Sequence, residues 1–210
     1  MRLLVPLQAL TVAMLATVLP LQPATAATFS ASFVEAFISA CTPERTSFSK
    51  TVAHARSLGW SEVETASNAE LAAMIKRSEK GIAEGRAEGY LSGYEMTVLS
   101  RVTAGRPLHL IVSLTRSKYL DMVGCYLYDF EATAPLDRAE VTRALGIEPA
   151  NKMDTPELVS AVWGPSPRYS RTFDTYLSFV PPGSPHAAKT GFDGAVLKFT
   201  VSAAKEPADK

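Results

Sequence analysis

The chain has 210 residues, 47% of them hydrophobic, and its 21 Lys and Arg balance 21 Asp and Glu to a formal net charge of zero. Near-neutrality removes the electrostatic case for a nucleic-acid-binding protein, because neutralising phosphates requires an excess of clustered cations. The length predicts one domain with a substantial hydrophobic core.

The start of the chain predicts export. After Met1 and Arg2 the sequence LLVPLQALTVAMLATVLPL carries no charge, and it is followed by the small-residue stretch Ala24-Thr25-Ala26. This pattern is typical of a secretory signal peptide over residues 1–26, cut after Ala26. An uncleaved anchor is the alternative, because the apolar run approaches spanning length. We expect cleavage, a periplasmic or secreted location, and no stable membrane anchor in the mature chain.

Cys41 and Cys125 are the chain's two cysteines. Because exported compartments are oxidising, we expect them to form a disulfide. Buried free thiols and a working thiol are alternatives, and so is lipidation at Cys41, because Ile38-Ser39-Ala40-Cys41 has the form of a lipobox. No metal site is expected, since the three histidines are scattered and the sequence has no C-x-x-C or H-x-x-x-H element. No cofactor is expected either, because the glycine-rich nucleotide-binding motifs are missing.

Three helices are predicted in the first half of the chain. Phe29, Phe33, Phe37 and Cys41 recur every four residues as one apolar stripe, with Ser32-x-x-Glu35 as the expected capping box. The second helix covers FSKTVAHARSL and ends at Gly59. The third begins after the N-cap Asn68, and the run IAEGRAEG that follows it is either a fraying helix or a linker.

The second half is predicted to be rich in strands, at residues 94–102, 108–115, 122–130, 157–163, 171–180 and 194–202. In the 122–130 strand, alternation turns Cys125 towards the helix that carries Cys41. A short helix after Asp137 interrupts the strands, and WGPSPRYS and VPPGSPHAAKTG are interpreted as long loops. The order predicts an α+β domain over 27–204, with N-terminal helices packed on a mainly antiparallel sheet and one inserted helix, before a disordered tail at 205–210.

Two arrangements could carry chemistry. Ser47-x-x-Lys50 and Lys189-Thr190-Gly191 resemble the S-x-x-K and K-T-G elements of penicillin-binding proteins and serine β-lactamases, where the lysine helps to activate the serine. The intermediate S-x-N or Y-x-N element is missing, so a serine acyl-enzyme is the alternative function rather than the leading one. The carboxylates of Asp129 and Glu131 share one face of a strand, where they could pair for acid–base work, but such residues more often mark a strand end at solvent.

An aromatic segment is the candidate binding surface. It combines Arg168 and Arg171 with the aromatic residues Trp163, Tyr169, Phe173, Tyr176 and Phe179. These side chains either line a ligand groove or protein-binding surface, or fill the core between sheet and helices, and we favour the core.

One resemblance extends over the first half of the mature chain. At Phe33, Phe37 and Cys41, then at Ala53-x-Ala55 and Gly59-Trp60, with a later cysteine in the strand GCYLYD, the sequence resembles small exported proteins of unknown function predicted in alphaproteobacteria. The resemblance implies a periplasmic disulfide and no activity. The leading hypothesis is therefore a non-enzymatic periplasmic or secreted domain that binds a protein or a small ligand in the envelope.

Overall fold

The computed structural model describes residues 26–204, so residues 1–25 of the predicted signal peptide and the predicted tail at 205–210 lie outside the described residues. The helices are α1 (Ala26–Cys41), α2 (Phe48–Ser57), the 3-10 turn η1 (Thr65–Ser67), α3 (Ala69–Ala87), α4 (Arg138–Leu145) and α5 (Pro185–Thr190). The strands are β1 (Ser61–Glu62), β2 (Leu91–Thr103), β3 (Arg106–Ser117), β4 (Met122–Asp129), β5 (Asn151–Asp154), β6 (Val159–Trp163), β7 (Thr172–Val180) and β8 (Gly194–Ser202).

The predicted α+β class is confirmed, with the N-terminal helices preceding one eight-stranded sheet in the order β1-β2-β3-β4-β8-β7-β6-β5. Every neighbouring pair of strands is antiparallel. The turn between β2 and β3 consists of Ala104 and Gly105, which both have positive φ. A two-residue turn of this kind matches the natural twist of a hairpin.

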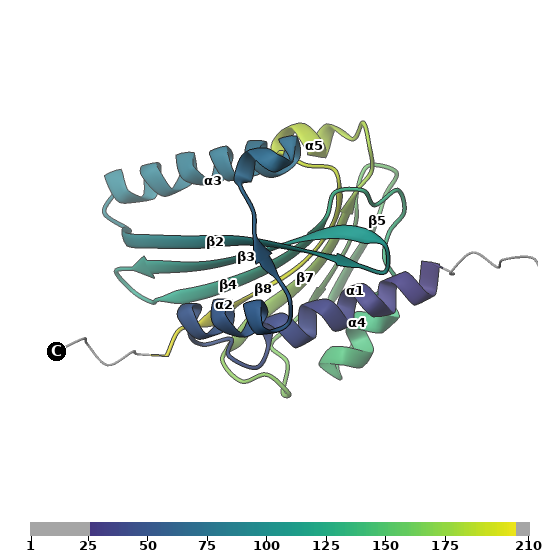
Figure 1. The fold of residues 1–210 in the computed structure, drawn as a ribbon, viewed down its shortest axis with the longest axis horizontal. Helices are drawn as coiled ribbons and strands as arrows, with labels where there is room; N and C mark the ends of the chain where they lie inside the picture. Colours follow the sequence, from purple (N-terminus) through teal and green to yellow (C-terminus); the bar gives the residue numbers. More distant parts are fainter. Residues whose placement is uncertain (1–25, 205–210) are drawn as a thin grey trace, which may run out of the picture.

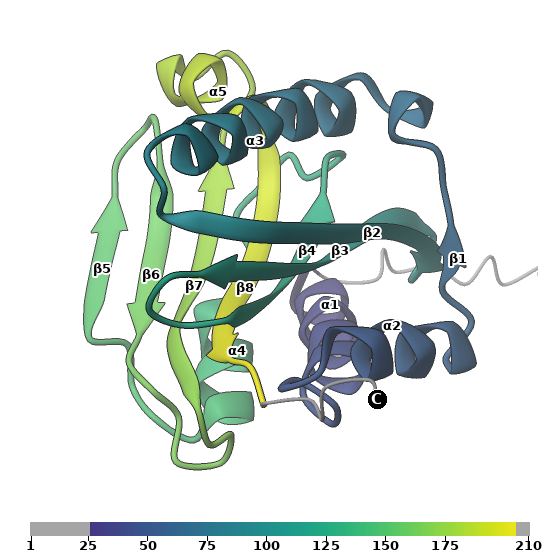
Figure 2. The same ribbon diagram turned by 90° about the vertical axis from the view of Figure 1, so that its left-hand side faces the viewer.

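Helices cover the sheet on both faces. Figures 1 and 2 show α1, α2 and α4 below the sheet and α3 with α5 above it. The strands also change direction strongly across the sheet: in Figure 2, β2 and β3 run across the view, whereas β5 to β8 run up and down it. The two faces bury separate hydrophobic clusters.

The structure corrects or completes several local expectations. The helix α1 begins at Ala26, so Ser32 lies inside it and cannot form the predicted capping box. Of the two interpretations of the run IAEGRAEG, the helix holds for residues 82–87, because α3 continues to Ala87. The predicted loop VPPGSPHAAKTG contains the short helix α5, which Ser184 caps by accepting a hydrogen bond from the His186 N–H. The strand β5 was not predicted, because its four residues are all exposed and give no alternation of apolar and polar positions.

The lower face of the sheet is sealed by the predicted helical stripe. Phe33, Phe37 and Cys41 are fully buried, and the Phe37 ring packs edge-on against Phe199 of β8, with ring centroids 5.1 Å apart. The end of α2 closes the same core, since Trp60 is buried directly after Gly59. The N–H groups of Gly59 and Trp60 donate to the last free carbonyls of α2, which is the Schellman arrangement that a glycine at this position permits.

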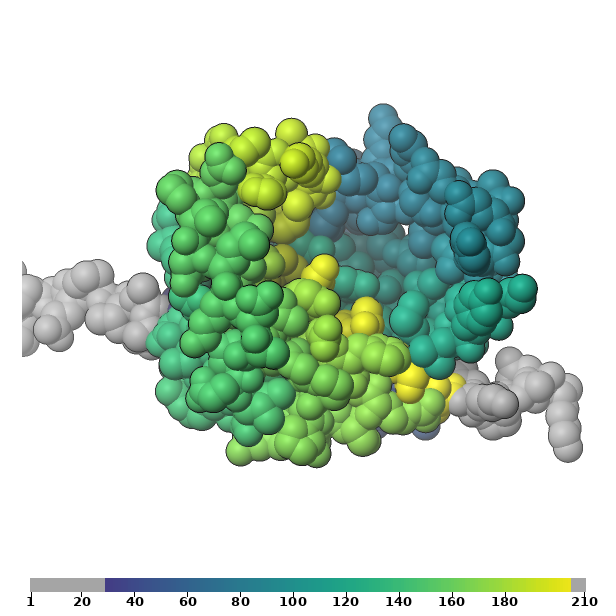
Figure 3. Space-filling view, turned by 180° about the vertical axis from the view of Figure 1, so that it is seen from behind, coloured from purple at the N-terminus to yellow at the C-terminus, as the bar shows by residue number. Residues whose placement is uncertain are grey.

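The upper face is covered only in part. The buried residues of α3 all lie in its first two turns and are Leu71, Met74 and Ile75. This half of the helix lies against α5, because Arg77 donates to the Ala188 carbonyl and a Cβ at Gly191 would lie only 3.1 Å from the Met74 Cα. The second half of α3 is exposed and contains Gly81 and Gly85. Figure 3 shows a hollow between these helices and the sheet, with atoms of β8 in yellow inside it.

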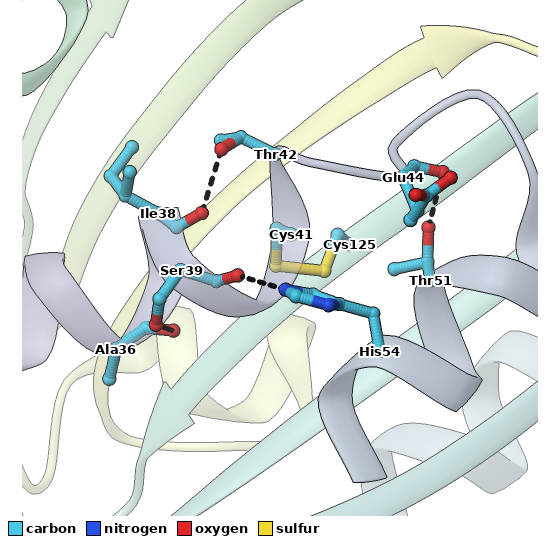
Figure 4. The surroundings of a disulfide bond; sticks show 9 residues. All are labelled: Ala36, Ile38, Ser39, Cys41, Thr42, Glu44, Thr51, His54 and Cys125. Atoms are coloured by element: carbon cyan, nitrogen blue, oxygen red, sulfur yellow. Dashed lines mark hydrogen bonds between the residues drawn. A yellow bond between two sulfur atoms is a disulfide. The ribbon is translucent and has the colours of Figure 1, made fainter. Parts of the chain in front are cut away.

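The predicted disulfide is confirmed. Cys41 at the end of α1 is bonded to Cys125 of β4, with Cα atoms 5.9 Å apart, and both residues are buried (Figure 4). Beside the bond, α2 is tied to α1 by a hydrogen bond of 3.0 Å between His54 Nε2 and the Ser39 carbonyl. Only a protonated nitrogen can donate to that oxygen. The covalent bond thus joins the N-terminal helices to the centre of the sheet.

Replacing both cysteines, as Cys41→Ala with Cys125→Ala, should lower the free energy of unfolding. The bridge closes a loop with a sequence separation of 84, and loop-closure entropy assigns such a bridge about 4 to 5 kcal/mol. Urea denaturation of the double variant and of the wild type measures the difference. As a control, the reduced wild type should have the same free energy of unfolding as the double variant, whose stability should not depend on reductant. A double variant as stable as the oxidised wild type would contradict this role of the disulfide.

Candidate functional site

A cavity of about 420 Å³ lies between α3 and the upper face of the sheet; we call it the α3 cavity. Its wall on the helix side is formed by Met74, Ile75, Ser78, Gly81 and Ile82. Its floor is formed by Tyr94, Met96, Ile111, Ser113, Thr115, Tyr126, Tyr128 and Lys198, from strands β2, β3, β4 and β8. A volume of this size is typical of small-molecule sites.

The cavity exists because α3 carries small residues where it crosses the sheet. Ser78 turns its hydroxyl back onto the Met74 carbonyl, at 3.2 Å, and so does not extend into the space below. At Gly81 a Cβ would meet no neighbouring atom within 4 Å. Larger side chains at these two positions would reach towards the sheet and occupy the cavity.

Glycine also shapes the floor. Gly124 lies on β4 next to Tyr126 on the same face, and a Cβ at Gly124 would lie 2.5 Å from the Tyr126 hydroxyl oxygen and 2.8 Å from Ser113 Oγ. The Tyr126 ring can therefore lie along the strand only because residue 124 has no side chain. This position brings the hydroxyls of Tyr126 and Ser113 close together at the floor of the cavity.

Lys198 is the one cationic side chain in the cavity lining. The register of the sheet sets it between two tyrosines, opposite Tyr126 of β4 and opposite Tyr176 of β7. Its Nζ lies 5.2 Å from the centroid of the Tyr176 ring, a cation–π distance. No carboxylate among residues 26–204 forms an ion pair with Lys198.

Burial changes the acid–base properties of the floor. It lowers the pKa of Lys198, because the ammonium loses hydration without gaining a carboxylate partner. It raises the pKa of Tyr94, Tyr126 and Tyr128, whose hydroxyls therefore keep their protons at neutral pH. The floor offers one cation and several neutral hydroxyl donors, and this set suits an anionic or polar group of a ligand better than a cation.

The residues of the serine acyl-enzyme hypothesis are not brought together. Ser47 is the N-cap of α2, where its hydroxyl accepts from the Lys50 N–H, and the Lys50 side chain is exposed. Lys189 lies in α5, which covers the opposite face of the sheet from α2 (Figures 1 and 2). These elements share sequence order with the penicillin-binding proteins but not a common site.

The predicted aromatic segment is divided between core and surface, since Phe179 is buried while Phe173 and Tyr176 are 39% and 37% exposed. Trp163 is fully buried, and its Nε1 donates to Thr142 Oγ1 at 3.1 Å, so it is a core residue. The predicted arginines serve internal contacts: Arg168 donates to the carbonyls of the last turn of α4, and Arg171 donates to Ser202 and Ala203. Tyr169 packs against the lower core.

The paired carboxylates also have a structural explanation. Asp129 is fully buried and forms an ion pair with Arg106 of β3. Its other oxygen accepts the Glu131 N–H at 3.1 Å, while the Glu131 side chain is exposed. Burial raises the pKa of Asp129, and the guanidinium of Arg106 opposes that shift. Asp129 therefore stabilises the end of β4 through Arg106 and the Glu131 N–H, and it does not form an acid–base couple with the Glu131 side chain.

No family model, curated protein or solved structure matches this chain. Within residues 26–204, no three His, Cys, Asp or Glu side chains gather as metal ligands would. None of the helices in the same range combines the length and apolar character needed to cross a bilayer. Any functional assignment therefore depends on the geometry of the α3 cavity.

One feature of the sequence does point to this cavity. Lys198 interrupts the apolar run GAVLKFTVS, and a lone cation in a central strand is unusual unless it is paired or functional. Its neighbours could not be identified from the sequence, because Tyr126 and Lys198 meet only through the register of β4 and β8.

Replacing Lys198 with methionine should stabilise the protein by about 1 kcal/mol, because a partly buried ammonium without a partner carries a desolvation cost. Because burial lowers the pKa of Lys198, the folded chain binds the ammonium proton less tightly than the unfolded chain does. The gain in stability from Lys198→Met should therefore shrink as the pH rises towards about 10.4, above which the lysine is neutral in both states. Urea unfolding curves over this pH range measure the difference. Lys152→Met, at an exposed position of β5, is the control and should change stability by less than about 0.5 kcal/mol. A loss of stability in Lys198→Met would contradict the assignment of an uncompensated charge.

Proposed function

We propose that the protein is an exported, disulfide-stabilised domain that binds a small ligand in the α3 cavity without transforming it. The observation that carries this proposal is an uncompensated Lys198 at the floor of a cavity of about 420 Å³. A protein retains such a charge at a cost in stability, and functional sites are where costs of this kind concentrate.

The chemistry of the lining favours binding over catalysis. A general acid–base mechanism needs a group that titrates near neutral pH within reach of the reacting atom. Burial raises the pKa values of the floor tyrosines, away from neutrality, and no histidine, aspartate or glutamate belongs to the lining. Lys198 is the one lining residue whose pKa moves towards neutrality, and no second titratable group of opposite role accompanies it. Apolar side chains with a few polar groups at one end are instead the usual composition of a ligand pocket.

Export is supported by the predicted signal peptide and by the disulfide. A buried bridge between Cys41 and Cys125 suits an oxidising compartment such as the periplasm or the exterior. The resemblance to small exported alphaproteobacterial proteins leads to the same expectation. In such a compartment a binding domain would hold a small molecule present in the envelope or the medium.

Filling the cavity should weaken binding. Gly81→Trp places an indole where the native helix leaves open space, whereas Ala83→Trp adds the same group to an exposed position of α3 outside the cavity lining. We expect the neutral fluorescent probe N-phenyl-1-naphthylamine to bind the wild type and Ala83→Trp alike, and Gly81→Trp at least about tenfold more weakly, a change of about 1.4 kcal/mol. Equal probe binding by all three proteins would show that the cavity is not the binding site.

The intact mass of the natively exported protein tests export and disulfide together. We expect the mass of residues 27–210 less two hydrogens, with alkylation of cysteine only after reduction. A mass that retains residues 1–26 would contradict signal cleavage. A lipid-sized increment on a chain that begins at Cys41 would make the protein a membrane-anchored lipoprotein instead.

A further inference from the structure

We propose that the ligand of the α3 cavity is an organic monocarboxylate with an apolar body, and that its carboxylate binds Lys198. This inference rests on the binding function proposed above and adds the chemical class of the ligand. Three features of the cavity support this ligand class, namely its charge, its hydrogen-bond donors and its apolar wall.

The charge of the cavity selects an anion with a single charge. Lys198 is the one cationic residue of the lining, and no acidic residue belongs to it. Asp174 accepts a hydrogen bond from the Tyr176 hydroxyl at 3.3 Å and forms no ion pair with Lys198. One carboxylate neutralises one ammonium, whereas a phosphate monoester, with a charge of about −1.5 to −2 at pH 7, would bring excess negative charge into the cavity.

The hydroxyl donors on the floor of the cavity fit carboxylate oxygens. Tyr126 is the cross-strand partner of Lys198, and its hydroxyl lies near Ser113 Oγ, since both atoms lie within 3 Å of the place that a Cβ of Gly124 would take. Tyr94, from strand β2, adds a second phenol to the same floor. Burial keeps both phenols protonated, so they can donate to an anion without being ionised. Hydrogen bonds to a charged acceptor are about twice as strong as neutral ones.

The opposite wall fits an apolar body. From α3 come Met74, Ile75 and Ile82, and from the sheet come Met96 and Ile111. Methionine side chains adapt their shape to what they contact, so this wall suits an alkyl chain or a similar flexible body. No arginine belongs to the lining, so the planar fork that would favour bidentate binding of phosphate is missing there.

Three ligands with the same chain separate head-group recognition from apolar binding. Octanoate, 1-octanol and octylammonium are titrated into the wild type by calorimetry, below their aggregation concentrations. We expect octanoate to bind at least about tenfold more tightly than 1-octanol, as a charge-assisted hydrogen bond allows, and octylammonium to bind most weakly. Octanoate binding no tighter than that of 1-octanol would overturn the proposed ligand class.

Variants locate the head-group contact. Lys198→Met should reduce octanoate binding to the level of 1-octanol and leave 1-octanol unchanged, while Lys198→Arg should retain most of the preference. Lys152→Met is the matched control and should bind as the wild type does. Unchanged octanoate binding by Lys198→Met would overturn the inference, and circular dichroism of each variant establishes that it is folded.

The two proposals can fail separately. If 1-octanol or octylammonium binds at least as well as octanoate and Gly81→Trp removes that binding, the cavity is a binding site and the carboxylate assignment is wrong. If no ligand binds, or if binding is the same in Gly81→Trp and Ala83→Trp, the proposed binding function fails and the carboxylate assignment fails with it.

Discussion

The alternation of β4 is the constraint on which the rest of the structure depends. Cys125 faces the sealed lower core and is bonded to Cys41, while Gly124 and Tyr126 on either side face the α3 cavity. A slip of one residue in the pairing of this strand would exchange the two sets of side chains. The disulfide excludes that slip, because only the observed register turns the sulfur of residue 125 towards α1. One covalent bond therefore fixes both the core and the floor of the cavity.

The two faces of the sheet differ in how completely they are packed. The lower face stabilises the domain through three features: the apolar stripe of α1, the buried Trp60 at the end of α2, and the disulfide. The upper face is packed only where the first turns of α3 meet α5, and it remains hollow under Gly81. A well-stabilised lower core allows the upper face to keep a cavity and a cation that both reduce stability. Such costs are tolerated where function requires them.

Local sequence patterns predicted the parts of the fold that depend on neighbouring residues. The stripe at Phe33, Phe37 and Cys41, the cap at Asn68 and the alternation around Cys125 all follow from periodicity or from one hydrogen bond. The cavity could not be predicted, because its floor is a row of residues from strands distant in the sequence. The segment that begins at Trp163 shows the same limit, because sequence alone does not separate the buried Trp163 and Phe179 from the exposed Phe173 and Tyr176.

NMR of the protein labelled with ¹³C at the lysine Cε atoms can show whether Lys198 binds the carboxylate of a ligand inside the cavity. The Lys198 resonance is identified by its loss in Lys198→Arg. We expect octanoate to shift this resonance strongly and to leave the resonances of exposed lysines, such as Lys152, unchanged. The bound carboxylate should also raise the pKa of Lys198 towards its ordinary value. A Lys198 resonance that neither shifts nor changes its titration at saturating octanoate would show that Lys198 does not bind the carboxylate.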